Sequence, residues 1–353
     1  MYRKFRKKIA QKFPELRYWA DCIMNCKSEK FRQSVIALAN YPGVFFFEKY
    51  GKLNPDKNIC IVGMDDNYIT QGGLMSEIRN LLVRFAMCEH YGFTPVVEFR
   101  DSLYSMETSV NGTTNAYEYF FEQPTTVSLS EAWNSQYVYV SRGIDALEFA
   151  DLNQNYDISG DQIAKMGELF RKYIRIKTSV ESIIQTQIDQ LLLQKKTLGV
   201  HIRGGDFKQL YEGHPIPVTP EEYIDPIKKL LVSGEYEQIF LATDDQEAID
   251  ILKDAFKEKL LYYDNVSRTD DGTGVHTTGF RTGKNGYQMG IEVLTDTYCL
   301  ANCDGLITGY SGAGLMAQII KCAKGQKYSQ KVILSNGFCN NGNVFPQRKR
   351  SKK

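Results

Sequence analysis

The segments NICIVGMD (58–65), LMSEIRNLLVRFAMCEHYG (74–92) and TPVVEF (94–99) decide the fold class. The first and the last are short apolar runs bounded by polar residues, which predicts strands. The middle segment repeats its apolar residues at helical spacing and follows a glycine turn at Gly72 and Gly73. A strand, a turn, a helix and a strand form a βαβ unit with parallel strands and a right-handed crossover.

The same alternation restarts in the second half of the chain. Strands are predicted at 197–203, 238–244, 260–264, 305–309 and 331–336, and helices at 220–234, 246–256, 289–303 and 313–322. Between the two series, 136–140 favours a strand and Ile163 to Gln194 favours a long helical stretch, whereas 100–135 is polar and irregular. We therefore expect an α/β protein of two Rossmann-like domains that face each other across a cleft.

The predicted boundaries follow from these patterns. Residues 1–56 are expected to form an N-terminal helical extension, 57–194 the first Rossmann-like domain, 195–345 the second domain and 346–353 a basic tail. The stretch 265–288 is long and polar, which is typical of a functional loop or of a merely flexible one. Its His276, Arg281 and Lys284 would be the groups that close over a ligand.

Composition excludes several protein classes. The chain has 353 residues, of which 42% are hydrophobic and 24% are charged, as in a globular protein. We find neither an apolar run long enough to span a membrane nor a secretory signal. The eight cysteines form no C-x-x-C pair, so we expect reduced thiols in a cytoplasmic protein, with no structural metal.

Positive charge is concentrated in the two tails. The first eight and the last eight residues each carry five Lys or Arg and no acid, while the whole chain has a net charge of only +1. The body between the tails is therefore net acidic, which argues against a nucleic-acid-binding surface. Two basic tails suit loose attachment to an anionic membrane, and they suit equally two solvated, frayed ends.

The motif HIRGGD follows the predicted strand 197–203 and comprises His201, Arg203, Gly204, Gly205 and Asp206. In open α/β sheets, ligands bind outside the carboxyl ends of the strands, and an arginine there suits bidentate capture of phosphate. The alternative is an Arg–Asp pair in a turn beside a structural histidine.

Two further strand ends carry polar groups. Thr243, Asp244 and Asp245 end one strand, where the carboxylates could bind a metal or Asp245 could cap the next helix. The stretch GYSGAG (309–314) lies between a strand and a helix, and its Ser311 and Gly312 begin a turn suited to an anion. Dinucleotide-binding, hydrolase-elbow and P-loop interpretations each lack a required partner residue.

Glu292 and Asp296 are four residues apart on the predicted helix 289–303, so they share one face. A carboxylate there can accept two N–H donors from a guanine edge. The alternative is an acidic face in solvent.

Taken together, these motifs resemble one family. H-x-R-x-x-D, then A-T-D-D, then Glu292, Asp296, Leu300, Asp304 and Ser311 at their spacing resemble the fucosyltransferase superfamily. That superfamily includes the rhizobial Nod-factor fucosyltransferase, the core α-1,6-fucosyltransferases and the protein O-fucosyltransferases. The resemblance extends from about Asn58 to about Ile320 and implies a GT-B fold, a GDP-fucose donor and inversion without an essential metal.

The resemblance also implies roles for residues. Arg203 would bind the β-phosphate and stabilise the departing GDP, and Asp296 would bind guanine. The implied donor-binding set is His201, Arg203, Gly204, Gly205, Thr243, Asp244, Asp245, Glu292, Asp296, Ser311, Gly312, Gly72 and Gly73.

The resemblance leaves the general base open. Lys208 and Glu212 resemble a Lys and a catalytic Glu of the core α-1,6 enzymes, displaced by one residue, so Glu212 ranks first and Asp206 second. Those enzymes have a second arginine directly after the first, where this chain has Gly204, which weakens the inference to the same linkage.

The sequence therefore predicts a bacterial, cytoplasmic fucosyltransferase that acts on a glycan or lipid-linked oligosaccharide. The alternatives are another nucleotide-sugar donor, a non-catalytic glycan- or nucleotide-binding module, and an NAD-dependent oxidoreductase.

Overall fold

The computed structural model describes residues 47–63, 72–99, 102–141, 158–269 and 283–343, with residues 45, 149, 152, 274 and 275 in addition. The helices predicted within 1–44, both basic tails, and His276 and Arg281 lie outside these residues. Residues 47–56, the described end of the expected helical extension, form no helix. Their polar, Gly- and Pro-containing sequence instead bridges to the chain that leads into β4, through Glu48 to Val138 and Leu53 to Ser135.

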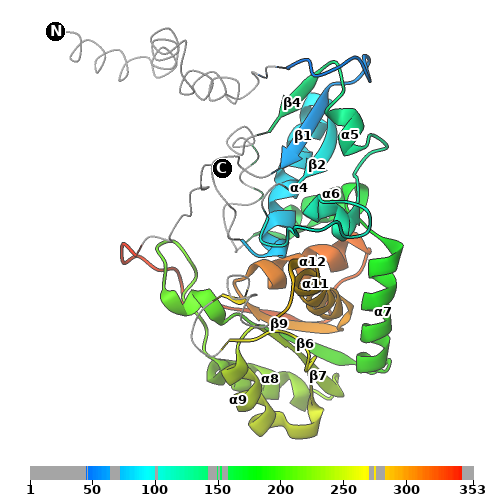
Figure 1. Cartoon of the computed structure of the whole chain (residues 1–353). Helices are drawn as coiled ribbons and strands as arrows, with labels where there is room; N and C mark the ends of the chain where they lie inside the picture. The colour runs from blue at the N-terminus through cyan, green and yellow to red at the C-terminus, as the bar shows by residue number, and fades with distance from the viewer. Residues whose placement is uncertain are drawn as a thin grey trace, which may run out of the picture.

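The first series of elements builds the predicted βαβ unit. Strand β1 (Ile59–Gly63) pairs in parallel with β2 (Thr94–Glu98) on one side and with β4 (Val138–Val140) on the other. Helix α4 (Leu74–Tyr91) crosses between β1 and β2 (Figure 1). It ends at Gly92 in the left-handed conformation that glycine favours. The segment predicted to be irregular contains short elements: η1 (Ala116–Tyr119), β3 (Phe121–Glu122) and α5 (Leu129–Ala132).

The stretch predicted to be helical from Ile163 to Gln194 is helical over most of its length, but a short strand divides it. The structure has α6 (Gly160–Tyr173), β5 (Arg175–Ile176) and α7 (Thr178–Leu192). Strand β5 pairs antiparallel with β3, and the Lys177 N–H donates to Phe120 O at 2.9 Å. The pairing of β5 with β3, a segment distant in the sequence, therefore interrupts a stretch whose local pattern is helical throughout.

The second series builds a five-stranded parallel sheet in the order β10-β9-β6-β7-β8. Its strands are β6 (Thr197–Ile202), β7 (Gln238–Thr243), β8 (Leu260–Leu261), β9 (Gly305–Gly309) and β10 (Lys331–Leu334). From β6 the chain proceeds to β7 and β8 on one side and then returns to β9 and β10 on the other. The direction therefore reverses between β6 and β9, which is where ligands bind in open α/β sheets.

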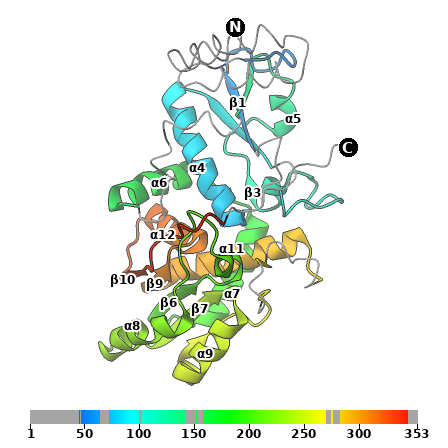
Figure 2. The same ribbon diagram turned by 90° about the vertical axis from the view of Figure 1, so that its left-hand side faces the viewer.

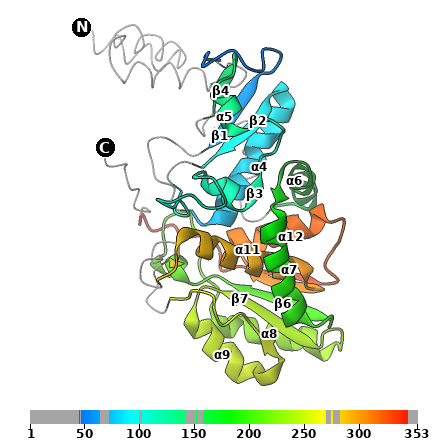
Figure 3. The same cartoon turned by 45° about the vertical axis from the view of Figure 1, so that its right-hand side comes forward.

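Helices cover both faces of this sheet. Helices α8 (Pro220–Val232) and α9 (Gln246–Phe256) pack on one face around residues such as Val200, Ile227 and Leu252. Helices α11 (Gly286–Asn302) and α12 (Gly312–Ala323) cover the other face. Figures 2 and 3 show α11 and α12 between the second sheet and helices α4 and α6.

The two halves share one hydrophobic core. A single cluster of buried residues joins Leu82 and Phe120 of the first half to Met289 and Ile320 of the second. The α/β class with parallel sheets is thus confirmed. Among the described residues, no helix is both long and apolar enough to cross a membrane.

Candidate functional site

A pocket of about 390 Å³ lies where β6, β7 and β9 end and α4 begins. The first half contributes five of its lining residues: Gly72, Gly73, Met75, Ser76 and Tyr104. The second half contributes residues from strand ends, the segment after β8, and helices α11 and α12. They are His201, Arg203, Phe207, His214, Ala242, Thr243, Asp244, Val266, Ser267, Val275, Met289, Glu292, Val293, Asp296, Ser311, Gly312 and Ala313.

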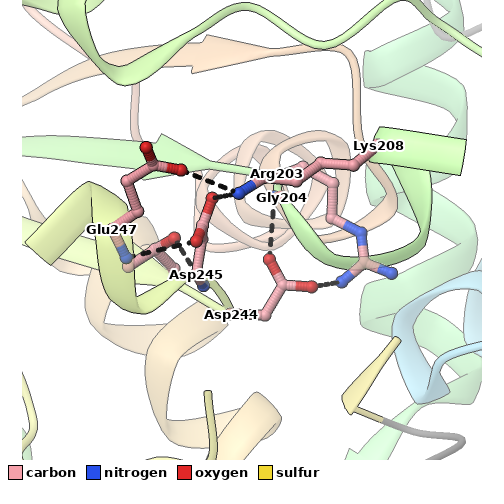
Figure 4. Close-up of polar contacts among 7 residues, drawn as sticks. Arg203, Gly204, Lys208, Asp244, Asp245 and Glu247 are labelled. Carbon is pink, nitrogen blue, oxygen red and sulfur yellow. Dashed lines mark hydrogen bonds and ion pairs between the residues drawn. The ribbon is translucent and has the colours of Figure 1, made fainter. Parts of the chain in front are cut away.

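Arg203 enters the pocket from the end of β6 and is held there by Asp244 from the end of β7. One Asp244 oxygen, Oδ2, pairs with the Arg203 guanidinium, and the other, Oδ1, accepts the Gly204 N–H at 2.9 Å (Figure 4). The guanidinium carbon also lies 5.4 Å from the centre of the Phe207 ring. Both oxygens of Asp244 are thereby engaged in orienting the motif, and a fixed guanidinium in a pocket is suited to a phosphate.

The glycine turn after β9 places a helix N-terminus in the same pocket. Ser311 is the N-cap of α12, and its Oγ accepts the Gly314 N–H at 3.0 Å. Gly312 and Ala313, the first residues of the helix, line the pocket. Their backbone N–H groups and the helix dipole favour an anion at this position, close to the cationic Arg203.

His201 is a neutral hydrogen-bonding group here. It is 6% exposed, and burial lowers its pKa to about 4. Its Nδ1 lies 3.1 Å from Ser311 Oγ and 3.4 Å from Thr308 Oγ1. Because the Thr308 hydroxyl donates to Gly309 O, Ser311 has the hydroxyl of the two that is able to donate to Nδ1.

Asp296 is a half-buried acidic group with no hydrogen-bond partner in the described part of the chain. It lies nearly three turns into α11 and lines the pocket. Burial raises the pKa of its carboxyl to about 7, an effect that the nearby Arg268 opposes and that Glu292 and Asp244 reinforce. A carboxylate in a pocket whose pKa is raised and that accepts no hydrogen bond from the described residues is a candidate group for binding a ligand.

Arg268 supports the side of the pocket that the segment after β8 forms, and it was not predicted from the sequence. Its guanidinium donates to Tyr263 O at 2.7 Å and to Val266 O at 3.2 Å, which shapes the turn that carries Val266 and Ser267 into the pocket. Burial lowers the pKa of Arg268, although its carboxylate neighbours oppose the shift. A basic residue in the segment that follows a strand of a parallel sheet was the available signal.

Glu292 is already engaged within the protein. Its carboxylate pairs with Lys284 and accepts the Ser267 N–H at 3.0 Å. Lys284, expected as part of a closing loop, also donates to Asn265 O. Of the two acids on this helix face, Asp296 is therefore the one whose hydrogen-bonding capacity is left for a ligand.

Several predicted site residues do not line the pocket. Asp245 is buried and caps α9, accepting the Glu247 N–H at 3.2 Å, as the alternative interpretation expected. The Nζ atom of Lys208 lies 2.7 Å from Asp245 Oδ2 and 3.1 Å from Glu247 Oε2 (Figure 4). Gly204 and Gly205 form the turn that joins these groups to β6, and the side chain of Asp206 lies outside the described part of the chain.

Glu212, ranked first as the general base, also lies outside the pocket lining. It is exposed, and its Oε2 accepts the N–H groups of Asn341 at 2.6 Å and Gly342 at 2.7 Å. The structure thus gives Glu212 an anchoring contact that its sequence position did not indicate.

The pocket residues of the first half were predicted only at Gly72 and Gly73. Tyr104 was not predicted as a pocket residue. Its hydroxyl accepts the Leu74 N–H at 3.0 Å and so provides a hydrogen-bond partner for the first backbone N–H group of α4. Burial raises the pKa of this hydroxyl, so it stays protonated. The irregular segment that carries Tyr104 has no periodic pattern from which the position of this residue could have been predicted.

Comparisons with known proteins give similarity at the level of overall structure. No family model and no curated protein sequence matches the chain. A NodZ α-1,6-fucosyltransferase crystallised with GDP is 14% identical, with a TM-score of 0.45 over 76% of this chain and 92% of that one. POFUT1 in complex with GDP-fucose is 11% identical, with a TM-score of 0.45 over 79% of this chain and 98% of that one.

The NodZ fucosyltransferase from Bradyrhizobium is similar to a comparable degree, with 14% identity and a TM-score of 0.42 over 76% of this chain and 92% of that one. The NodZ structures are of fucosyltransferases, the class that the sequence motifs resemble. TM-scores below 0.5 assign no role to any residue of this chain.

Proposed function

We propose that the protein is an inverting glycosyltransferase that moves fucose from GDP-fucose to a hydroxyl of a glycan or lipid-linked oligosaccharide. The observation that carries this proposal is the Asp296 carboxylate, which accepts no hydrogen bond from the described residues and shares its pocket with Arg203 and the N-terminus of α12. The carboxylate of Asp296 accepts N–H donors, whereas Arg203 and the helix N-terminus bind anions. A guanine nucleoside diphosphate is a ligand that presents both kinds of partner.

The proposed chemistry is electrostatic. The N1–H and N2–H groups of guanine would donate to Asp296, and the diphosphate would bind Arg203 and the backbone N–H groups of Gly312 and Ala313. As the bond from fucose to the β-phosphate breaks, negative charge grows on GDP, and a fixed guanidinium and helix N-terminus stabilise it. These groups supply the role that a metal has in other transferases, so we propose metal-independent transfer within a GT-B arrangement of the two halves.

The acceptor hydroxyl must lose a proton during transfer. Glu212 and Asp206 stay our candidates for this base, in that order. Glu212 precedes His214, which lines the pocket, by two residues, and its Oε1 is left for a substrate when Oε2 binds the backbone.

Calorimetric titration tests the donor. We expect the protein to bind GDP more tightly than UDP, CDP or NAD, with and without EDTA. Asp296→Asn should remove the preference for GDP, because an amide cannot accept two N–H donors as a carboxylate does. Arg203→Ala should weaken GDP binding and leave guanosine binding unchanged, since it removes a phosphate partner only. Tight UDP or NAD binding, or GDP binding that requires a divalent metal, would refute the assignment.

Turnover separates an enzyme from a binding module. With GDP-fucose and a glycan mixture, the wild type should release GDP, and Glu212→Gln should release it more slowly at unchanged GDP affinity. Unchanged turnover in that variant would transfer the base role to Asp206.

The basic tails motivate a proposed location. We expect the protein to bind vesicles that contain anionic lipids at low salt and to dissociate at high salt. Failure to bind at low salt would remove the membrane face as the place of reaction.

A further inference from the structure

Two segments that follow strands of the second sheet form a ribbon beside the pocket. Residues 210–216 follow β6, and residues 336–343 follow β10. They pair antiparallel through Gly213 N–H to Cys339 O at 3.0 Å, Cys339 N–H to His214 O at 2.9 Å and Ile216 N–H to Gly337 O at 2.9 Å. Both segments follow carboxyl ends of parallel strands, so the ribbon lies at the same edge of the sheet as the pocket-lining strand ends. His214 belongs to both the ribbon and the pocket lining.

The ribbon exposes an aromatic surface. Phe338 is 44% exposed and belongs to none of the hydrophobic core clusters. Its ring stacks on that of Tyr310, with centroids 5.6 Å apart and planes inclined by 18°. An exposed phenylalanine stacked on a second ring leaves a flat apolar face to solvent, an arrangement typical of a binding surface.

This face is adjacent to the proposed diphosphate site. Tyr310 immediately precedes Ser311, the N-cap of the helix that we expect to hold the phosphates. A second set of rings links the ribbon to Arg203: Tyr211 lies 5.8 Å from His214, and His214 lies 5.6 Å from Phe207, over which Arg203 packs.

Transfer chemistry requires the acceptor close to this part of the pocket. The anomeric carbon of a nucleotide sugar is bonded to the β-phosphate, so the acceptor must reach the space next to the phosphate-binding groups. In an inverting transfer its hydroxyl attacks the face of that carbon opposite the departing phosphate. Tyr310 directly precedes the phosphate turn in the chain, and Phe338 stacks on Tyr310, so the ring pair adjoins that turn.

We infer that Phe338 and Tyr310 form an acceptor subsite on which a pyranose ring of the acceptor stacks. This inference rests on the proposed function and extends it by assigning the acceptor sugar to two named residues. One face of a pyranose presents C–H groups, which pack on the electron-rich face of an aromatic ring, while its hydroxyls point outward around the rim. Asn340, two residues after Phe338, is exposed and carries an amide of the kind that binds sugar hydroxyls.

Saturation-transfer NMR on the GDP-loaded full chain tests the subsite. The probes are the methyl glycosides of glucose, galactose, mannose and N-acetylglucosamine, with a β-1,4-linked N-acetylglucosamine trisaccharide. We expect transfer to the ring protons of one face of at least one probe. Phe338→Ala should reduce the signal by about tenfold or more, and Phe338→Tyr should retain it because the ring is kept.

A matched control is Tyr137→Ala, since Tyr137 is 42% exposed and lies next to β4 of the first sheet. This variant should bind the probe as the wild type does. All four proteins should bind GDP equally, because none of the changes is in the pocket lining.

The possible failures are distinguishable. If the wild type does not bind GDP, the proposed function fails. If it binds GDP and the sugar signal survives in Phe338→Ala, or no probe binds, the inference fails alone. Binding of a serine- and threonine-containing peptide in place of every sugar, with loss in Phe338→Ala, would likewise overturn the sugar assignment.

Discussion

The Asp296 carboxyl changes charge near neutral pH, because burial raises its pKa to about 7. Guanine offers N–H donors, so it requires the ionised carboxylate. As the pH falls below 7, protonation removes the acceptor, and the affinity for GDP should fall by up to about tenfold per pH unit. Titrations from about pH 5.5 to 8.5 measure this, and Asp296→Asn should show no such slope.

A second group could complicate that profile, and the structure excludes one candidate. Burial lowers the pKa of His201 to about 4, so this histidine stays neutral across the same range. Free phosphate groups of GDP titrate near pH 6. Guanosine, which lacks them, is therefore the control ligand, and a pH-independent affinity of guanosine would contradict the role assigned to Asp296.

Gly204 shows how one residue restricts the motif. A Cβ at this position would lie 2.5 Å from Asp245 Oδ2 and 2.6 Å from Asp245 Cβ. This explains why the chain has no second arginine here, where the core α-1,6 enzymes that it resembles have one. Asp245 cannot withdraw cheaply, because it caps α9 and pairs with Lys208.

We expect Gly204→Ala to destabilise the protein by roughly 1 to 3 kcal/mol in urea unfolding, through overpacking. Gly160→Ala is the matched control, since a Cβ at Gly160, the first residue of α6, meets nothing within 4 Å. An equal effect of the two substitutions would show that the contact with Asp245 does not limit position 204.

At the scale of elements, Glu212 joins the two segments of the ribbon. If anchoring is its role, Glu212→Ala should increase hydrogen exchange at Asn341 and Gly342, whose N–H groups it accepts. Glu212→Gln keeps an acceptor oxygen and should protect both amides largely as the wild type does. Slower turnover in Glu212→Gln with intact protection would then identify proton transfer, and not anchoring, as the lost function.

The elements that the sequence predicted well are those whose pattern is local. The predicted strands are apolar runs whose two faces are both covered in the fold, and the structure confirms them at 59–63, 94–98, 197–202 and 238–243. The interruption of the helical stretch from Ile163 to Gln194 was not predicted, because β5 exists only through its pairing with β3. The residue types of Arg175 and Ile176 alone do not predict that they pair with β3.

The site was predictable where strands position it and not elsewhere. His201, Arg203, Asp244 and Ser311 follow parallel strands, so the sheet gathers them at one edge. Tyr104 and Arg268 come from segments without a period, and the two acceptor bonds of Glu212 depend on a segment 129 residues away. Such placements arise from tertiary packing, which a sequence pattern does not contain.

On the scale of the whole molecule, the pocket requires both halves at once. Helix α11 carries Asp296 and Glu292, covers one face of the second sheet, and packs against α4 and Phe120 of the first half. A Cβ on Gly290 would lie 2.1 Å from Phe120 Cζ, so glycine permits this close approach. The distance between the halves, and therefore the width of the pocket, depends on this contact.

We expect Gly290→Ala to destabilise the protein by roughly 1 to 3 kcal/mol and to weaken GDP binding, because the added methyl group displaces α11 from the first half. Phe120→Leu removes the ring atoms that the methyl group would meet. The double variant should therefore be less destabilised in urea unfolding than the sum of the single variants, and it should recover part of the GDP affinity lost in Gly290→Ala. Strictly additive free energies with no recovery of binding would mean that the contact between Gly290 and Phe120 does not set the spacing of the two halves.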